Sequence, residues 1–226
     1  MNLELNNFIA ENTQNNWQPP ADVPRSLFDS DWPWAPIVST DYDPAPIFQE
    51  LVDLNPLFVP HRDKDKIHSY NHEGWHSLTL HGIGESYTEN YDRYGFSSQQ
   101  EADYRWTQCC ERAPNLINLI RSFPFTNYGR IRIMRLAPGG FIMPHTDGRG
   151  RIFGPFNFAL NNPEGCSFVF EKYGRVPFES GRGFMLDLGI KHAVLNNSNS
   201  SRYHVIIHGH QTPGCHQRVT ESLKLL

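Results

Sequence analysis

Hydrophobic and polar residues alternate in short stretches along the second half of the chain, which predicts strands that each bury one face. In residues 128–136 two sets of side chains fall on opposite faces, Ile131, Ile133 and Arg135 against Arg130, Arg132 and Met134. Residues 141–146 continue from this stretch, and further strands are predicted at 156–160, 166–171, 183–188, 192–195 and 202–208. Turn residues separate the stretches at 138–140, 161–165 and 196–199.

The first 125 residues follow a different pattern. Prolines recur throughout residues 1–60 and interrupt any long helix, so we expect an irregular segment there with a short helix at 47–54. Alternation predicts a strand at 75–82. Two more helices are predicted, one at 97–112 with Ser97 as its N-cap and one that begins at Pro114.

Many short strands with turns between them indicate a mainly β fold, and a double-stranded β-helix fits best. This is the jelly-roll, cupin-like architecture, here with N-terminal helices and an irregular extension. The length of 226 residues suits one domain. Within residues 1–226 we expect a support region at 1–125, the β-helix core at 126–210 and a tail at 211–226.

Composition excludes several classes of partner. The chain carries 20 Lys and Arg against 24 Asp and Glu, a net charge of −4, so nothing attracts it to nucleic acid. No apolar run is long enough to span a membrane, and the N-terminus lacks the pattern of a signal peptide. Four cysteines without disulfide-like spacing, two of them adjacent at Cys109 and Cys110, favour a reduced, cytoplasmic protein.

His145, Asp147 and His192 form the most informative pattern in the sequence. Residues i and i+2 of a strand share a face, so His145 and Asp147 can converge where a strand ends, and His192 begins another predicted strand. Two imidazoles and one carboxylate on a metal leave an open face, which is typical of non-haem Fe(II) oxygenases. A His-x-Asp motif alone is a weak signal, because Asp147-Gly148 is also a common turn.

Arg202 strengthens the interpretation. It begins an apolar predicted strand, where a buried guanidinium needs an anion, and its planar fork suits the carboxylate of an acidic co-substrate. His204 shares its strand face and could line the same pocket, or be a satisfied core histidine. His208 and His210 share that face if the strand is regular that far.

Two other motifs carry alternative readings. Residues 72–76 match the His-Glu-x-x-His pattern of zinc proteases, which requires a helix; Gly74 and the alternation that follows favour a strand. Residues 148–151 form a basic, glycine-rich loop that could hold an acidic substrate or be a solvated turn. Arg130, Arg132 and Arg135 are ordinary sheet residues unless one of them faces the pocket.

Residues 129–209 resemble the aspartyl/asparaginyl β-hydroxylase family of Fe(II)- and 2-oxoglutarate-dependent dioxygenases. The matching positions are Pro138-Gly139, Pro144-His145-Thr146, Pro163 to Cys166, Gly183 to Asp187, His192, Asn196 and Arg202. The resemblance implies a double-stranded β-helix, iron on His145 and His192, and 2-oxoglutarate held by Arg202.

Two departures from the family pattern affect the expected substrate. The peptide-hydroxylating branch lacks a carboxylate two residues after the first histidine, whereas this chain has Asp147 and can form a full triad. That branch also places an Arg-x-His pair near the co-substrate, where this chain has Pro155-Phe156-Asn157. The second arginine is absent there, but Asn157 could still donate a hydrogen bond to 2-oxoglutarate.

We therefore expect a dioxygenase that uses Fe(II), 2-oxoglutarate and dioxygen to hydroxylate an amino-acid side chain, free or in a peptide. The alternative is a non-redox, cupin-like metal- or ligand-binding module. Arg202 separates the two readings, because such a module has no need for a buried guanidinium there.

Overall fold

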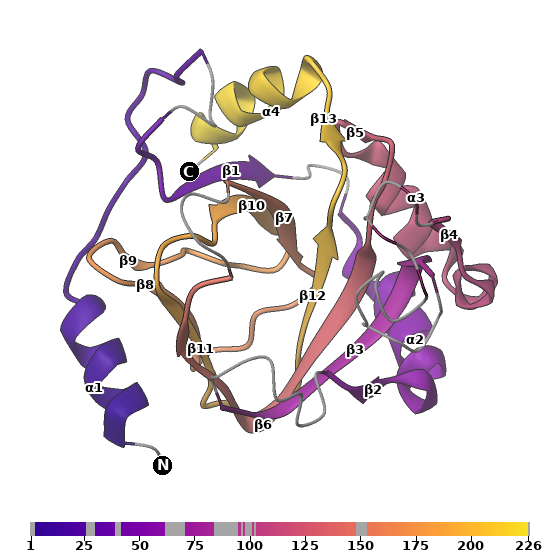
Figure 1. Cartoon of the computed structure of the whole chain (residues 1–226), viewed down its shortest axis with the longest axis horizontal. Coiled ribbons are helices and arrows are strands. Elements are labelled where there is room, and N and C mark those ends of the chain that lie inside the picture. The colour runs from indigo at the N-terminus through magenta and orange to yellow at the C-terminus, as the bar shows by residue number, and fades with distance from the viewer. Residues whose placement is uncertain are drawn as a thin grey trace.

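The computed structural model describes residues 3–25, 30–38, 42–61, 71–83, 95, 97, 101, 103–147 and 153–225. Within these residues eleven strands form one antiparallel sheet that curls on itself (Figure 1). The main path through the sheet runs β1 (Trp34–Val38), β10 (Arg182–Asp187), β7 (Phe153–Ala159), β12 (Arg202–Ile207), β6 (Ile131–His145), β11 (His192–Asn196), β8 (Cys166–Phe170) and β9 (Gly174–Arg175). The mainly β, jelly-roll prediction is confirmed.

Five further strands lie outside this main path. Beside β6 lies β3 (His72–Gly82), which also pairs with β2 (Val59–Pro60) and β4 (Arg105–Trp106). A separate two-stranded sheet joins β5 (Phe125–Thr126) to β13 (His210–Gln211). The helices are α1 (Leu3–Asn12), α2 (Pro44–Leu54), α3 (Pro114–Ser122) and α4 (Gly214–Leu223), with 3₁₀ turns at Asn55–Leu57 and Gln108–Arg112.

The long strand β6 makes the corner of the curled sheet. Its first part pairs with β12 and its last part with β11, while β3 runs beside both. The corner contains Gly139, at φ +72°, and Gly140, where a Cβ would lie 2.8 Å from the carbonyl oxygen of Ala137. Only glycine fits so close an approach of backbone. The prediction of a turn between two strands at 138–140 is therefore wrong, because these residues bend one continuous strand.

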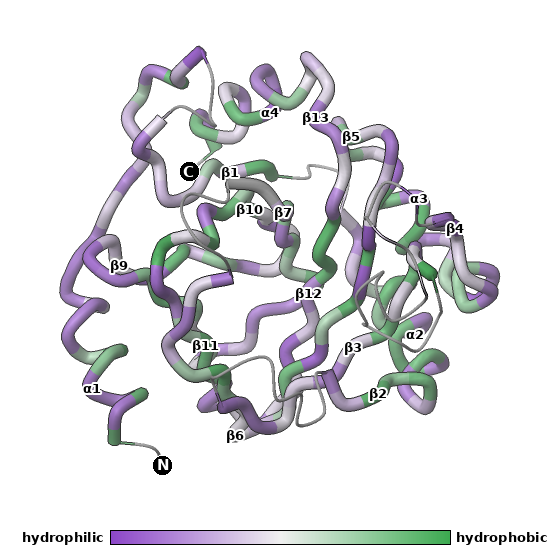
Figure 2. The backbone as a smooth tube through the Cα atoms, in the orientation of Figure 1, coloured by the Kyte–Doolittle hydropathy of each residue, from purple (hydrophilic) through white to green (hydrophobic). Residues whose placement is uncertain are grey.

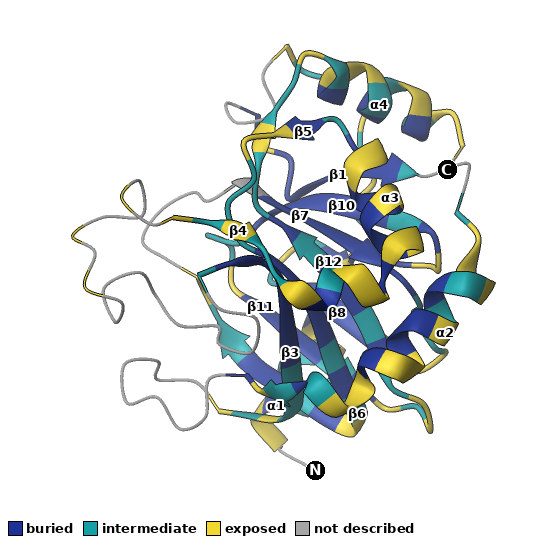
Figure 3. Ribbon diagram, turned by 90° about the vertical axis from the view of Figure 1, so that its right-hand side faces the viewer, coloured by how far each residue is buried: buried dark blue, intermediate teal, exposed yellow. Residues whose placement is uncertain are grey.

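Two hydrophobic layers lie on opposite sides of the sheet. The outer layer packs α2 and α3 against the sheet through residues such as Leu51, Leu116 and Ile133. Figure 3 shows the buried sides of both helices turned toward the strands, and Figure 2 shows the hydrophobic segments in them. The inner layer, inside the curl, contains Phe170 and Phe184. Arg202 and His204 also lie buried here, on strands that present one face inward.

The N-terminal region is more regular than the sequence predicted. The segment expected to be irregular contains α1 and the edge strand β1, in addition to the predicted helix α2. An edge strand tolerates Pro36, because its missing N–H has no partner strand to bond. Leu5 of α1 packs on Met143 and Ala193, which belong to β6 and β11.

The helix predicted at 97–112 is also wrong over its described residues 103–112. These residues form β4 and a 3₁₀ turn instead. The hydroxyl of Thr107 donates to the carbonyl oxygen of Thr79 at 2.9 Å, and the backbone N–H of Thr107 donates to Leu80, both in β3. Pairing with β3 therefore overrides the local helical preference.

Several other sequence predictions can be compared with the structure. Residues 72–76 lie in β3, so the helix that a zinc protease requires is absent from them. The glycine-rich loop at 148–151 lies outside the described residues. Cys109, Cys110, Cys166 and Cys215 are all free thiols. Among the described helices, none is long and apolar enough to cross a membrane.

Candidate metal centre

Three side chains with metal-binding atoms converge at one end of the curl. His145 ends β6 and His192 begins β11, and the two residues are direct partners in the antiparallel pair. Asp147 follows His145 by two positions, and its backbone N–H donates to the carbonyl oxygen of Leu188 at 3.0 Å. The candidate ligand atoms of all three residues lie within 4.8 Å of one another. This is the convergence that the sequence predicted.

Hydrogen bonds fix how both imidazoles face the centre. Nδ1 of His145 lies 2.8 Å from the carbonyl oxygen of Met143, and Nδ1 of His192 lies 2.9 Å from that of Ile190. A carbonyl oxygen only accepts, so each Nδ1 carries a hydrogen, and Nε2 is the nitrogen of each ring that can bind a metal. Nε2 of His145 is 3.4 Å from a carboxylate oxygen of Asp147. Such backbone bonds are the usual way in which a protein orients metal-binding histidines.

A short turn sets the position of His192. The carboxylate of Asp187 accepts a hydrogen bond from the backbone N–H of Gly189 at 3.1 Å, and the N–H of Ile190 donates to the carbonyl oxygen of Asp187. The ring of His192 then stacks on Phe168, with the ring centroids 5.2 Å apart and an angle of 11° between planes. The histidine therefore has little freedom to leave the site.

The protonation of His192 also suits metal binding. Burial, with a smaller contribution from the neighbouring His145, lowers the pKa of His192 to about 4. The imidazole is therefore neutral near pH 7, which is the form that coordinates a metal. Two imidazole nitrogens and one carboxylate are the donor set of an open-faced, non-haem Fe(II) centre. By the chemistry of its donors, the triad fits such an ion.

A buried cation lies in the same cavity as the triad. The side chain of Arg202 is almost fully buried, and burial lowers its pKa to about 10, so it remains charged at neutral pH. Its Nε donates to the side-chain oxygen of Asn162 at 3.2 Å, and its Nη2 donates to Nδ1 of His204 at 3.0 Å. No carboxylate among the described residues pairs with it. A buried guanidinium without an acid is a site for an anion.

His204 presents a second polar atom to that anion. In the tautomer that carries its hydrogen on Nε2, Nδ1 of His204 accepts a hydrogen bond from Nη2 of Arg202 at 3.0 Å. In the other tautomer, Nδ1 donates to the side-chain oxygen of Asn157, which lies 2.7 Å away. Nε2 is buried and has no hydrogen-bond partner. A buried polar atom without a partner is costly, so Nε2 of His204 indicates a missing ligand.

Hydrophobic side chains enclose the space between the triad and the arginine. The cavity has a volume of about 70 Å³, and its walls include Trp75, Met134, Phe168, Leu186 and Ile206. The six residues named as site candidates from the sequence all line it: His145, Asp147, Asn157, His192, Arg202 and His204. Their roles stay predictions, but the fold brings them together.

Some parts of the site were not evident in the sequence. Asn162, which bonds Arg202, belongs to a stretch that looks like an ordinary turn, and Phe178 packs under both Arg202 and His204. Neither residue stands in a recognisable motif. Of the histidines expected to follow His204 on one face, His208 comes after the last residue of β12 and His210 belongs to β13.

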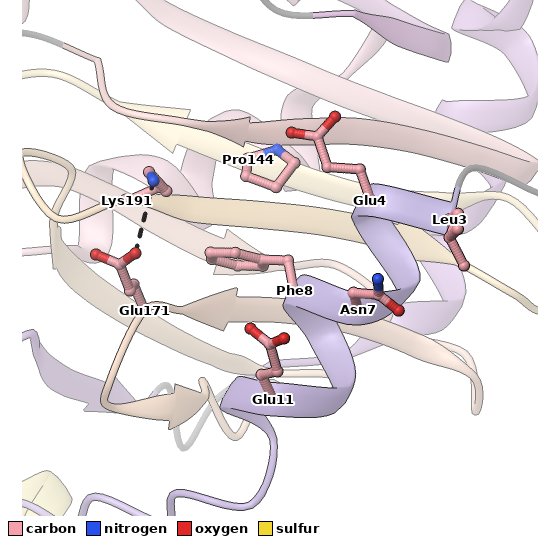
Figure 4. A pocket seen from close by; sticks show the side chains of 8 residues that line it. All are labelled: Leu3, Glu4, Asn7, Phe8, Glu11, Pro144, Glu171 and Lys191. Atoms are coloured by element: carbon pink, nitrogen blue, oxygen red, sulfur yellow. Dashed lines mark ion pairs between the residues drawn. The ribbon is translucent and has the colours of Figure 1, made fainter.

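The outer face behind the triad is covered by α1. Because Pro144 precedes His145 in β6, the two side chains point to opposite faces of the strand. Figure 4 shows Pro144 beside Glu4 and Phe8 of α1, in a hollow that also contains the ion pair of Lys191 with Glu171 at 3.6 Å. This hollow is separate from the cavity and lies outside the curl. The helix therefore supports the strands that carry both histidines.

The sequence and the fold were compared with known proteins. Residues 46–211 match the profile of the family described as Aspartyl/Asparaginyl beta-hydroxylase. No relative was found among curated proteins.

The solved structures with a similar fold are distant in sequence. A prolyl hydroxylase from Trichoplax adhaerens, in complex with a peptide of hypoxia inducible factor, is 11% identical, with a TM-score of 0.51 over 84% of this chain and 87% of that one. A Pseudomonas putida prolyl-4-hydroxylase is 12% identical, with a TM-score of 0.43 over 80% and 93%. A viral collagen prolyl hydroxylase from Paramecium Bursaria Chlorella virus-1 is 11% identical, with a TM-score of 0.43 over 80% and 97%. At these identities the likeness concerns the fold alone.

Proposed function

Because the chain belongs to the aspartyl/asparaginyl beta-hydroxylase family, we propose that it is an Fe(II)- and 2-oxoglutarate-dependent dioxygenase. Its substrate is an amino-acid side chain, free or within a peptide. The observation that carries the proposal is the position of Arg202, a buried cation without an acid partner among the described residues, in the cavity of the triad. A metal-binding module without redox function gives no reason for that arrangement.

His145, Asp147 and His192 would hold the iron. When bound there, Fe(II) supplies the redox chemistry that couples conversion of 2-oxoglutarate and dioxygen to succinate and carbon dioxide with hydroxylation of a C–H bond. The protein contributes the geometry of the donors. Bonds from both Nδ1 atoms to backbone carbonyls hold the imidazoles in position before any metal arrives.

Arg202, His204 and Asn157 would orient the co-substrate. Two donors of a guanidinium can hold one carboxylate by parallel hydrogen bonds, and Nε2 of His204, in the tautomer that carries its hydrogen there, would add a third donor at the same end of the cavity. Asn157 keeps His204 in place through its contact with Nδ1. Anchored at this end, an acidic co-substrate would extend toward the triad.

The apolar walls have a role of their own. Phe168, Leu186 and Val194 surround the space next to the triad with hydrocarbon. Such walls exclude water, which strengthens the electrostatic contacts inside and limits side reactions.

The test of this proposal is turnover. Purified protein is incubated in air with Fe(II), ascorbate, 2-oxoglutarate and pools of L-amino acids and short peptides, and succinate and substrate masses are followed. We expect succinate together with a product that has gained one oxygen atom, and neither when a chelator removes the iron. A protein that binds iron but gives no succinate with any pool would favour the cupin-like module.

A further inference from the structure

Asn162 contacts the buried guanidinium of Arg202 from a loop outside the cavity. The loop joins β7 to β8, and the side-chain oxygen of Asn162 accepts a hydrogen bond from Nε of Arg202 at 3.2 Å. The side-chain nitrogen of Asn162 donates to the carbonyl oxygen of Phe178 at 3.0 Å. Arg202 lines the cavity, whereas Asn162 is not among the described residues that do. The asparagine therefore reaches the cation without entering the space in which a co-substrate would lie.

The preceding residue, Asn161, fixes this loop on the strand that carries Arg202. The side-chain nitrogen of Asn161 donates to the carbonyl oxygen of Ser201 at 2.9 Å, and its side-chain oxygen accepts from the backbone N–H of Tyr203. The backbone N–H of Asn161 also donates to the carbonyl oxygen of Tyr203, at 3.1 Å. Because these bonds lie on both sides of Arg202, they hold Asn162 beside the guanidinium independently of its own bond to it.

Phe178 is a second support of the cation. The guanidinium carbon of Arg202 lies over its ring, 5.6 Å from the centroid, and the ring of His204 meets it edge-on with the centroids 4.6 Å apart. An aromatic face attracts a guanidinium through the ring quadrupole. Since Asn162 bonds the backbone of Phe178 as well as Arg202, one side chain connects the cation with the aromatic ring beneath it.

All of these supports are uncharged. An amide oxygen and an aromatic ring carry no net charge, and burial lowers the pKa of His204 well below its ordinary value, so the imidazole is neutral. The thiol of Cys166 also acts on Arg202 electrostatically, but burial raises the pKa of this thiol above its ordinary value, so it is neutral near pH 7. Within the described part of the chain, the contacts of Arg202 therefore orient its positive charge without cancelling it.

The bond to Asn162 also decides which edge of the guanidinium can take a carboxylate. A guanidinium can pair with a carboxylate either through Nε and one Nη atom or through both Nη atoms. Asn162 occupies Nε, so the first edge is in use. Nη1 makes no hydrogen bond to a described residue. The edge formed by the two Nη atoms is the one left for an anion in the cavity.

We propose that Asn162 is a positioning residue of the co-substrate site, which presents the Nη edge of Arg202 to the cavity and, as a neutral partner, leaves the positive charge to 2-oxoglutarate. This inference rests on the proposed function and adds to it a residue that does not touch the co-substrate. Asn162→Asp would keep an oxygen next to Nε, but its negative charge would compete with the co-substrate for the same cation. A nearly isosteric change should therefore impair binding more than a truncation.

Anaerobic titration of the Fe(II)-loaded proteins with 2-oxoglutarate, followed by the visible band of the complex, measures this order. Asn162→Ala should raise Kd by about 3- to 10-fold, the effect of one lost hydrogen bond. Asn162→Asp should raise Kd by about 10- to 100-fold, because it removes the contribution of a charged contact. Asn199→Asp is the matched control, since it adds the same charge at an exposed position three residues before Arg202 and should leave Kd unchanged.

Thermal unfolding of the metal-free proteins tests the contact itself. Asn162→Asp should lower Tm more when it is combined with Arg202→Met than when it is made alone, because only Arg202 can compensate the introduced carboxylate. A residue that merely supports the loop would lose equal amounts in the two backgrounds. It would also make Asn162→Ala, which removes both hydrogen bonds, more harmful than Asn162→Asp.

Three results would overturn the inference. The first is an unchanged Kd in Asn162→Ala, and the second is a Kd in Asn162→Asp no higher than that in Asn162→Ala. The third is an equal loss of Tm from Asn162→Asp with and without Arg202. If Asn162→Asp does not fold, the Kd of Asn162→Ala decides alone. Absence of the band in the unsubstituted protein would instead contradict the proposed function, and the unfolding experiment would still test the contact of Asn162 with Arg202.

Discussion

Replacement of Arg202 by methionine should change stability and co-substrate affinity in opposite directions. The guanidinium is buried without an acid partner among the described residues, and its pKa falls from 12.5 to about 10. Because both values exceed 7, the group is charged in the folded and unfolded protein, and the folded state bears the whole desolvation cost at neutral pH. A pKa shift of this size corresponds to a cost of about 3 kcal/mol to the stability of the folded protein.

The variant gains stability because it no longer buries a charge, but lost hydrogen bonds offset part of this gain. Methionine cannot donate to Asn162 or His204, and each lost hydrogen bond costs about 1 kcal/mol. We therefore expect the metal-free variant to be more stable by about 1 kcal/mol, which for a chain of this length raises Tm by about 2–4 °C. The affinity for 2-oxoglutarate should fall by about 10- to 100-fold, since a charged hydrogen-bonded contact contributes about 1.5–3 kcal/mol.

Urea and thermal unfolding of the metal-free proteins measure the first effect. Anaerobic titration of the Fe(II)-loaded proteins with 2-oxoglutarate measures the second. If Arg202→Met loses several kcal/mol of stability and keeps its affinity for 2-oxoglutarate, Arg202 is a structural residue and the reasoning is refuted.

Three further predictions concern the triad, the co-substrate donor and the supporting helix. Asp147→Ala should abolish iron binding in a metal titration and hydroxylation with it; substantial remaining activity would mean that two histidines suffice. His204→Leu should weaken 2-oxoglutarate binding by about tenfold, the effect of one lost hydrogen bond to a charged group, while His204→Gln, which can present a side-chain N–H, should retain more of the affinity in the same titration. Leu5→Ala should destabilise the protein by about 2–5 kcal/mol in urea unfolding, because Leu5 is fully buried against Met143 and Ala193; a loss below 1 kcal/mol would show that α1 does not support these strands.

The candidate site was largely predictable because all of its residues except Asp147 stand on strands. Alternation gives the side of each residue, so the convergence of His145 with Asp147 and the shared face of Arg202 with His204 follow from spacing of two. To predict that His192 faces His145, one further assumption was needed, namely that their two strands are neighbours. The register of β11 and β6 shows that they are.

The parts that could not be predicted depend on contacts between distant segments. Asn162 reaches Arg202 from a loop, and a loop carries no periodicity that would indicate its partner. Thr107 fixes residues 105–112 on β3 through bonds to Thr79 and Leu80, against a local sequence that favours a helix. Gly139 and Gly140 look like a chain reversal until the pairing of β3 along both arms of β6 is known.

The most direct measurement of the central claim is the visible charge-transfer band that forms when 2-oxoglutarate is added to the Fe(II)-loaded protein without dioxygen. It needs no knowledge of the substrate and reports metal, co-substrate and site together. We predict that the unsubstituted protein shows the band, that His192→Ala loses it, and that His216→Ala, at an exposed position of α4, keeps it. A band that persists in His192→Ala, or that never forms although iron is bound, would contradict the account.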